Sequence, residues 1–415
     1  MSTESKLQEG IYYSKGSSPG KFFCILFLRA DSSRNAAAIG EYISGLWNMY
    51  SNLRKGIIND LDGHEVPHGN LNILVGYGLN IFSLKGIKKN IPPYLTTFGK
   101  FNSPLQSGGG PIFLGAGLKY DDNLLKNVAT EDLALQFTAD SQLAVNRCIV
   151  ETWKHFHDNV NPQTGKAPLS IIHFFSGFQR DDFRSMLDFH DGLSNMKSGK
   201  PRLDAIAIKP SGVEEERWTE NGTYLAFLRL AVDLGIWRKI PRIRQEIIVG
   251  RDKLTGCPII DMDSNGNPIV TAGCPVPGTK AVTQPGNEIF HDIAIGDIRN
   301  DELKRSHVIR SNLKRGEPAL RDSLRIFRQG YEFLEPIEKE PGFRVGLNFV
   351  SFQDTPERLY RMLTNPNWLG NTNFGGNSDT SLPGMDKLLS VMAGGIYLVP
   401  PISRSEGYPG SSIFI

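Results

Sequence analysis

An acidic residue in a tight turn is the first group in this sequence that could do chemistry. Asp191 precedes Gly192 and lies among apolar and aromatic residues in the segment 184–195. An Asp-Gly pair usually marks only a turn. A carboxylate beside a buried pocket can nevertheless have its pKa moved towards the working pH, and it can then carry a proton between two substrate atoms. The turn alone favours the structural interpretation, because perturbed carboxylates indicate function only statistically.

A histidine and an arginine further along the chain are the other two candidates. His307 lies in the polar segment 304–312, and Arg328 lies in the segment 325–331. A single histidine is more often structural than a ligand, but an imidazole is the usual proximal ligand of haem iron in peroxidases. Arg328 is set among apolar residues, where it either stacks on its neighbours or holds a fixed positive charge over a reacting anion. Each motif alone is weak evidence.

Two further patterns match known motifs and are rejected. His64-Glu-Val-Pro-His68 fits the HExxH pattern of zinc proteases, which requires both histidines on one face of a helix. Pro67 would remove a backbone donor and clash with the preceding helical turn, so we reject the zinc interpretation. The glycines at 108–110 are not followed by the lysine and serine or threonine of a phosphate-binding loop, and we expect a turn there.

The composition is that of a globular protein with a balanced charge. The chain has 415 residues, 40% hydrophobic and 22% charged, and 46 basic residues against 44 acidic ones give a net charge of +2. This length exceeds one compact core of ordinary size, so two domains or one large double domain are expected. No apolar run approaches the roughly 18 residues of a membrane span. The small net charge would not attract a polyanion. We therefore expect neither a membrane nor a nucleic-acid partner.

The N-terminal residues and the cysteines bear on the compartment. The first twenty residues are polar and lack the basic flank and apolar stretch of an export signal. The four cysteines are scattered and form no CxxC pair, so no disulfide framework is expected; they are Cys24, Cys148, Cys257 and Cys274. These features predict a cytoplasmic protein. The sequence leaves a homo-oligomer open.

Strand and helix patterns predict an α+β fold with two similar halves. Strand patterns occupy residues 21–30, 133–137, 224–236 and 347–349, and helical patterns occupy 36–54, 140–156 and 355–363. The two halves match in pattern and not in residue identity, which supports an ancient duplication with a boundary near residue 215. Long stretches rich in glycine, proline and asparagine are expected to be loops, and they occupy 98–118, 250–290 and 365–386.

The combination and order of these motifs resembles the dye-decolourising peroxidases, haem enzymes built from two ferredoxin-like α+β halves. The turn Asp188-Phe-His-Asp191-Gly192 resembles the family's GxxDG motif, which carries the distal aspartate. His307 matches the proximal histidine, and Arg328 lies in a RILRxG-like stretch. The resemblance covers most of the chain. It implies antiparallel sheets with peripheral helices, a domain 1–215 that carries the distal turn, and a haem-binding domain 216–415.

The resemblance also implies further residues around the haem. Arg251 lies in Gly250-Arg251-Asp-Lys253, which is similar to a GRxK segment near the haem propionates. Leu347 and Phe349 lie on a strand similar to the one that lines the family's distal pocket. Asp386 looks like the acidic partner of the proximal histidine.

Two departures from the family pattern stand out. Asp188 replaces the first glycine of GxxDG, which alters the expected turn and would place a second carboxylate near Asp191. Around His307 the family commonly has HxR and then an Asn-Pro pair, whereas this chain has Arg310 and Asn312-Leu313. Neither departure removes a group that the chemistry requires.

The resemblance implies a haem b-dependent peroxidase that uses hydrogen peroxide to oxidise dyes, phenols or similar aromatic reductants in one-electron steps. Asp191 would move a proton between the peroxide oxygens, and Arg328 would stabilise the anionic peroxide. A hydrogen bond from His307 to Asp386 would strengthen the ligand. The carboxylate shuttle predicts an acidic activity optimum. The alternative is a non-catalytic haem or porphyrin carrier or sensor on the same scaffold, which would require neither Asp191 nor Arg328.

Bulky dyes could not reach a buried haem, so aromatic side chains are candidate sites for relaying electrons. The tryptophans and tyrosines considered are Trp47, Trp153, Trp218, Trp237, Trp368 and Tyr360. Most buried aromatic residues serve packing. The sequence selects none of the six.

Overall fold

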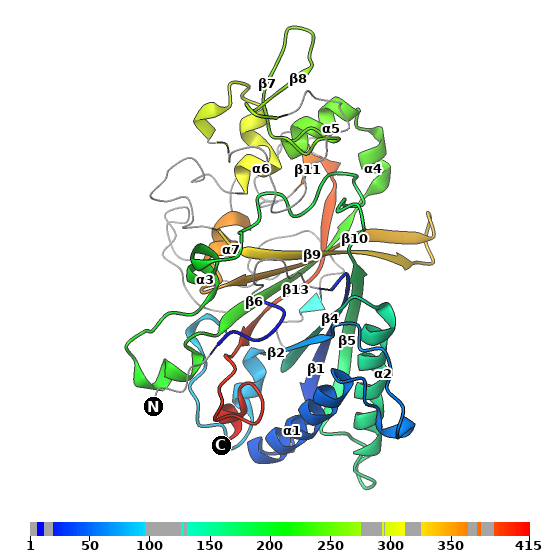
Figure 1. Ribbon diagram of the computed structural model, residues 1–415, viewed down its shortest axis with the longest axis vertical. Coiled ribbons are helices and arrows are strands. Elements are labelled where there is room, and N and C mark those ends of the chain that lie inside the picture. Colours follow the sequence, from blue (N-terminus) through cyan, green and yellow to red (C-terminus); the bar gives the residue numbers. More distant parts are fainter. Residues whose placement is uncertain are drawn as a thin grey trace.

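One large sheet, antiparallel except at its β3 edge, organises the molecule (Figure 1). The computed structural model describes residues 6–11, 20–95, 126–127, 131–274, 293, 295–311, 325–363, 372–374 and 386–415. Within these ranges the strand order is β2-β4-β1-β5-β9-β10-β6-β13-β3, and a further pairing of β13 with β2 joins the two ends. The sheet from β2 round to β13 therefore closes on itself. The short strand β3 (Lys126–Asn127) lies parallel beside β13.

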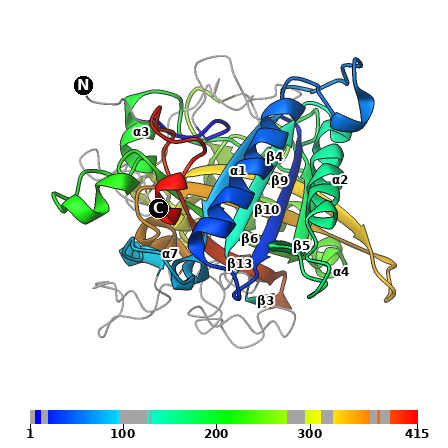
Figure 2. The same ribbon diagram turned by 90° about the horizontal axis from the view of Figure 1, so that it is seen from below.

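The first half is a βαββαβ unit. Its strands are β1 (Phe22–Ala30), β2 (Asn72–Tyr77), β4 (Leu133–Ala139) and β5 (Leu169–Phe178), and its helices are α1 (Ala36–Leu53) and α2 (Gln142–Asp158). The strand order β2-β4-β1-β5 is that of a ferredoxin-like fold. In Figure 2, α1 and α2 lie side by side across one face of these strands.

The second half repeats this arrangement. Its strands are β6 (Thr223–Val232), β9 (Phe327–Pro336), β10 (Phe343–Gln353) and β13 (Leu389–Val399), in the order β9-β10-β6-β13. Helix α7 (Glu357–Leu363) follows β10. The other elements are α3 (Lys200–Ile206), α4 (Leu234–Lys239), α5 (Arg242–Val249), β7 (Ile259–Met262), β8 (Pro268–Val270), α6 (His307–Arg310), β11 (Thr372–Asn373) and β12 (Asp386–Lys387). The predicted α+β class with two ferredoxin-like halves is confirmed.

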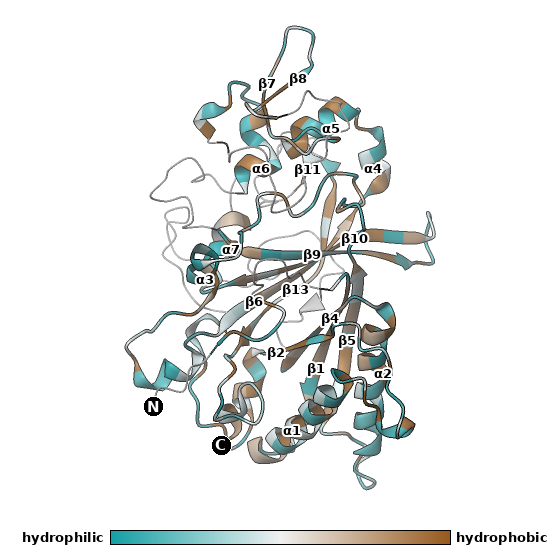
Figure 3. Cartoon of the chain, viewed as in Figure 1, coloured by the Kyte–Doolittle hydropathy of each residue, from teal (hydrophilic) through white to brown (hydrophobic). Residues whose placement is uncertain are grey.

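Alternate residues of the strands face two different cores. Residues on the inner face pack between the two halves, and this core includes Phe23, Phe27, Phe227, Tyr331, Phe352 and Tyr397. Residues on the outer face of the first half pack under α1 and α2, where Leu26 and Leu135 meet Ile39 and Leu46. Side chains alternate between the faces of a strand, so both faces must be apolar when both are covered. Figure 3 accordingly shows mostly hydrophobic strands and helices with one hydrophilic side.

Most element predictions agree with the structure, and two are wrong. The stretch 250–290, expected to be a loop, contains the antiparallel pair of β7 and β8. The strand expected to reach residue 236 ends at Val232, because the Asp233 side chain accepts a hydrogen bond from the N–H of Ile236 at 2.8 Å and caps α4. The four scattered cysteines predict no disulfide framework, and the structure adds one bond that they did not indicate, between Cys257 and Cys274 across 17 positions of sequence. The segment 64–68 is not helical, so it lacks the geometry that HExxH requires.

The connection between the halves runs from residue 179 to 222. The boundary predicted near residue 215 falls in this segment, within the 3-10 helix Glu214–Thr219, while the sheet continues from β5 to β9. No helix in the described ranges has the length and apolar composition needed to cross a membrane. The glycines at 108–110, Asn312, Trp368 and the side chain of Tyr360 lie outside the described residues.

Candidate active site

A cavity lies against the outer face of the second half. Its floor consists of alternate strand residues, and these include Arg328, Gly330 and Glu332 of β9, Leu347 and Phe349 of β10, and Leu230 of β6. The register places them in rows: Glu332 is opposite Leu347, which is opposite Leu230. Directly opposed residues share one face of a sheet. The floor is therefore polar along β9 and apolar along β10 and β6, and it includes the predicted residues Leu347, Phe349 and Arg328.

Asp191 reaches this floor from the turn that precedes α3. Its N–H donates to the carbonyl oxygen of Phe183 at 2.8 Å, and its Oδ1 accepts from the N–H of Gly192 at 2.7 Å. Its other carboxylate oxygen lies directly over Gly330, where an added Cβ would come within 2.8 Å of Oδ2. A glycine at position 330 thus leaves the space that the Asp191 carboxylate occupies.

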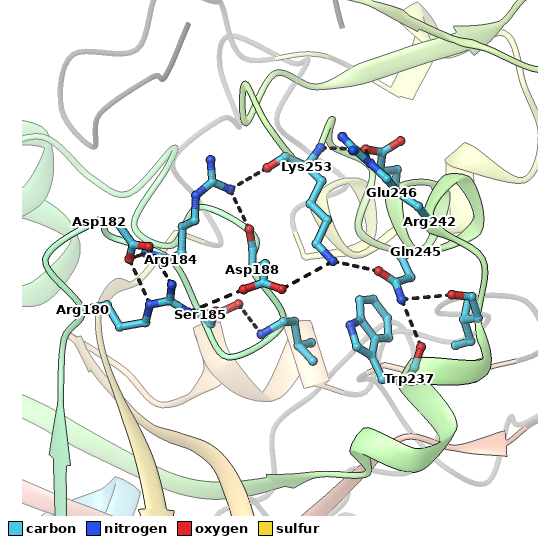
Figure 4. A network of polar contacts seen from close by, with 12 residues as sticks. Arg180, Asp182, Arg184, Ser185, Asp188, Trp237, Arg242, Gln245, Glu246 and Lys253 are labelled. Atoms are coloured by element: carbon cyan, nitrogen blue, oxygen red, sulfur yellow. Dashed lines mark hydrogen bonds and ion pairs between the residues drawn. The ribbon is translucent and has the colours of Figure 1, made fainter. Parts of the chain in front are cut away.

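Asp188 faces away from this cavity. Its side chain is 63% exposed and lies 3.5 Å from Arg180 Nη1 and 3.9 Å from Lys253 Nζ, in the polar network of Figure 4. Its φ of 64° is left-handed, which explains why a glycine suits this position and why aspartate can replace it. The expectation that Asp188 adds a second carboxylate beside Asp191 is therefore wrong.

The second carboxyl group of the cavity is Glu332, which sequence reasoning missed. The side chain is buried and lines the cavity, and Oε2 accepts a hydrogen bond from the N–H of Met186 at 3.2 Å. Burial and then the nearby charge of Asp191 raise its pKa to about 8. The two-residue alternation from Arg328 through Gly330 was a signal that could have indicated Glu332.

Hydrogen bonds hold the Asp191 turn against β9. Arg328 Nη2 donates to the carbonyl oxygen of Leu193 at 2.8 Å. Asn195 Nδ2 donates to the Arg328 carbonyl oxygen at 2.7 Å, and Asn195 Oδ1 accepts from the Arg328 N–H at 3.3 Å. These hydrogen bonds fix the position of the Asp191 turn relative to Arg328 on the β9 side of the cavity.

A second polar group forms around Arg251. Arg251 is buried, and its guanidinium donates to the carbonyl oxygen of Gly256 at 2.7 Å and to Ser194 Oγ at 3.0 Å. His190 contacts the same segment, because a Cβ on Gly256 would lie 3.5 Å from the His190 side chain. Burial, followed by the charge of Arg184, lowers the His190 pKa to about 4. Arg251 and His190 both line the cavity.

His307 lines the cavity from the start of α6. Its ring meets Phe374 edge to face, with the centroids 5.1 Å apart. Asp386, expected to accept a hydrogen bond from His307, is instead exposed on β12 and is not among the cavity-lining residues. The structure thus brings together six of the seven predicted site residues and places the seventh elsewhere.

More than half of this chain matches the model of a known protein family. The family model described as "Dyp-type peroxidase, C-terminal" matches residues 182–404, more than half of the chain. The chain belongs to the Dyp-type peroxidase family. This confirms the resemblance seen in the sequence. The matched range includes the Asp191 turn, His307 and β9.

Solved structures of Dyp-type peroxidases have the same fold. Ferric DtpA from Streptomyces lividans has a TM-score of 0.67 at 18% identity, covering 100% of this chain and 96% of that chain. The DyP-type peroxidase from Cellulomonas bogoriensis has a TM-score of 0.65 at 18% identity, with 98% and 96% covered. At this identity the likeness establishes the fold.

Curated proteins named Deferrochelatase are also similar to this chain, over a smaller share of its length than the solved structures. The protein of this name from Shigella flexneri is 22% identical over 302 residues, which is 72% of this chain and 61% of the relative. The Escherichia coli K12 protein is also 22% identical over 302 residues, covering 60% of its own length. The chain spans about three-fifths of the curated relatives it matches.

The cavity of this Dyp-type family member fits a haem. Neither ring nitrogen of His190 has a hydrogen-bond partner among the described residues, although the side chain is only 7% exposed. A buried nitrogen without a partner is costly. A bound carboxylate such as a haem propionate would satisfy it, and the Arg251 guanidinium would balance the charge. The apolar floor suits the porphyrin face, and the imidazole of His307 suits iron.

Proposed function

We propose that this chain is a haem b-dependent peroxidase that reduces hydrogen peroxide and oxidises dyes, phenols or similar aromatic reductants. One observation carries the proposal: Asp191 and Arg328 lie on the β9 side of the same cavity that His307 lines from α6. A site that only carried haem would need neither the carboxylate nor the guanidinium. Family membership supports the same assignment.

Haem bound through His307 would supply the electrons that reduce the peroxide. Asp191 accepts the proton of one peroxide oxygen and delivers it to the other, which leaves as water. Arg328 stabilises the negative charge that develops between these proton transfers. Overall, one peroxide and two reductant molecules, each giving one electron and one proton, yield two waters and two oxidised reductants.

The remaining cavity residues hold and orient the cofactor. Arg251, Ser194 and His190 form the donor group that would bind a propionate. Leu347 and Phe349 form the apolar part of the floor beside Asp191. These contacts would fix the iron relative to Asp191 and Arg328, and such positioning is a large part of catalysis.

The cellular setting stays a prediction. The N-terminal residues predict a cytoplasmic location, whereas the disulfide between Cys257 and Cys274 is more typical of an oxidising compartment. Assembly into a homo-oligomer is likewise a prediction. Gel filtration would test the oligomeric state. A thiol assay of freshly lysed cells would test whether Cys257 and Cys274 are oxidised in the cell, which bears on the compartment.

The test begins with the absorption spectrum of the purified protein. We expect a Soret band that disappears in His307→Ala but persists in His157→Ala, since His157 is an exposed histidine on α2. We expect peroxide-dependent dye oxidation to fall roughly 10²- to 10⁴-fold in Asp191→Asn and Arg328→Leu with the Soret band retained. Absence of haem after expression with adequate haem supply would refute the proposal. Bound haem without peroxide-dependent oxidation would favour the carrier or sensor.

A further inference from the structure

Glu332 is a buried carboxyl group for which the mechanism above has no role. It is 6% exposed, lies on the cavity wall, and accepts one hydrogen bond from the described residues, at Oε2 from the N–H of Met186. A buried carboxylate with one neutral donor is poorly stabilised, so the group favours its protonated form.

The sheet geometry brings Glu332 close to Asp191. Residues two apart on a strand lie on the same face, about 6.6 Å apart along the strand. The Asp191 carboxylate rests over Gly330, two residues before Glu332. Both carboxyl groups therefore project from β9 and its covering turn into one cavity.

The charges around this pair favour one negative charge and not two. Asp191 raises the Glu332 pKa and Arg180 lowers it, while burial has the largest effect. Arg328, on the same face of β9, and His190, in the covering turn, also line the cavity. The pKa of His190 is lowered to about 4, so its ring is neutral near pH 7. Two adjacent carboxylates repel each other, and because Glu332 is buried while Asp191 is only half-buried, Glu332 is the one that retains a proton.

We propose that Asp191 and Glu332 form a carboxyl pair that carries a single negative charge, with Glu332 as the partner that holds the proton and Asp191 as the partner that accepts the peroxide proton. The proposal rests on the peroxidase function proposed above. Glu332 acts through Asp191 and is a positioning residue. When Glu332 ionises at alkaline pH, a second negative charge enters the cavity and disfavours the peroxide anion that forms when Asp191 accepts the peroxide proton.

Infrared spectroscopy of the haem-free protein tests the pair without any activity. We expect a protonated-carboxyl C=O band that shifts in D₂O, titrates near pH 8, and is absent in Glu332→Gln. In Asp191→Asn the band should persist but titrate at a lower pH, because the raising charge is gone. Leu334→Gln is the matched control, since Leu334 is the next residue on the same face of β9 and is 59% exposed. A wild-type spectrum that lacks this band at pH 6 would overturn the proposal.

The pH profile of peroxide reduction by the haem-loaded protein is the second measurement. In the wild type we expect kcat/KM to fall roughly tenfold per pH unit above the Glu332 midpoint. In Glu332→Gln, where the neutral amide mimics the protonated acid, this alkaline decline should be lost while the rate at pH 6 is retained. An equal loss at every pH would show a merely structural role and would overturn the proposal.

The two measurements separate this proposal from the proposed function. A titrating band in a protein without peroxidase activity would refute the peroxidase assignment and leave the carboxyl pair standing. Peroxidase activity in a protein without the band would support the peroxidase assignment and refute the carboxyl pair.

Discussion

The outer faces of the two halves have the same strand order but different coverings. In the first half, α1 and α2 pack on this face, and Leu26 and Leu135 are almost fully buried. In the second half, Leu230 and Phe349 occupy the corresponding outer face, and both are only partly buried because they border the cavity. The same topology thus closes a core in one half and opens a site in the other.

The connections explain this difference. In the first half, α1 begins soon after β1 ends and returns directly over the sheet. In the second half, the connection from β6 to β9 first forms α4, α5, the β7–β8 pair and α6. Figure 1 shows these elements gathered at the end of the molecule farthest from α1. The long connection brings His307 and Arg251 to the cavity and leaves a space over the part of the strand face that carries Leu230 and Phe349. Packing contacts are lost there and a binding site is gained.

Truncating one leucine in each half tests the comparison most strongly. Leu26→Ala should destabilise the haem-free protein by about 2–5 kcal/mol, because it leaves a void in a closed core. Leu230→Ala should cost less than about 1 kcal/mol, because its side chain already borders a cavity. Urea denaturation of both haem-free variants measures the difference. Equal losses would show that the second face is packed as tightly as the first.

Filling the space above Gly330 should impair the site without unfolding the half that carries it. Gly330→Ala places a Cβ against Asp191 Oδ2 and should lower kcat/KM for peroxide roughly 10²-fold, since small misplacements of a reacting group cost about this much. Gly330→Val should lower it further. The control is Gly296→Ala, because a Cβ on this exposed glycine meets no atom within 4 Å. Unchanged kinetics in Gly330→Ala would mean that the Asp191 position is not critical.

Sequence reasoning recovered what depends on local pattern. The strands at 21–30 and 347–349 and the helices at 36–54 and 140–156 were found because apolar periodicity and capping residues are local signals. The two similar α+β halves followed from the same patterns. Their ferredoxin-like topology, and Arg251, Leu347 and Phe349 as site residues, came only with the family resemblance. The strand from 224 failed at Asp233, since an apolar run continued past a residue that also caps a helix.

The errors at the site concern residues whose role depends on distant neighbours. Glu332 gains its environment from Asp191 and Met186, over 140 positions away in the chain. Asp188 was expected beside Asp191, but a left-handed backbone turns its side chain towards Arg180 and Lys253. Neither backbone handedness nor strand pairing across the turn can be deduced from composition. The disulfide between Cys257 and Cys274 was missed for the same reason, because the course of the two loops that bring these cysteines together is not a local signal.

Replacing His190 should have opposite effects on stability and haem retention. His190→Leu removes a buried imidazole without hydrogen-bond partners among the described residues, so the haem-free protein should gain about 1–3 kcal/mol. Haem retention should decrease, because a propionate partner is lost. Urea denaturation and haem transfer to apomyoglobin measure the two quantities. His157→Leu, at an exposed histidine on α2, controls for the general effect of the substitution. Loss of stability in His190→Leu would contradict this account.

The same variant should also change the pH dependence of stability. The folded pKa of His190, about 4, is below its unfolded value, so the unfolded state binds the proton more readily between these pH values. Wild-type stability should therefore fall as the pH drops from about 6.5 towards 4. In His190→Leu this part of the acid-side decline should be absent, whereas the His157→Leu control should retain it.

The smallest effect is expected on the outer side of the active-site turn. Asp188→Gly removes two surface ion pairs, which are worth at most about 1 kcal/mol, but it also relieves a left-handed aspartate. These terms nearly cancel, so stability should change by about 0.5 kcal/mol or less and dye oxidation should be retained. Asp188→Val removes the same charges but cannot adopt this backbone easily, and should cost about 1–2 kcal/mol. Thermal unfolding of both variants separates the backbone contribution from the charge. A large kinetic defect in Asp188→Gly would show that the surface network, and not only the cavity side of the turn, sets the position of Asp191.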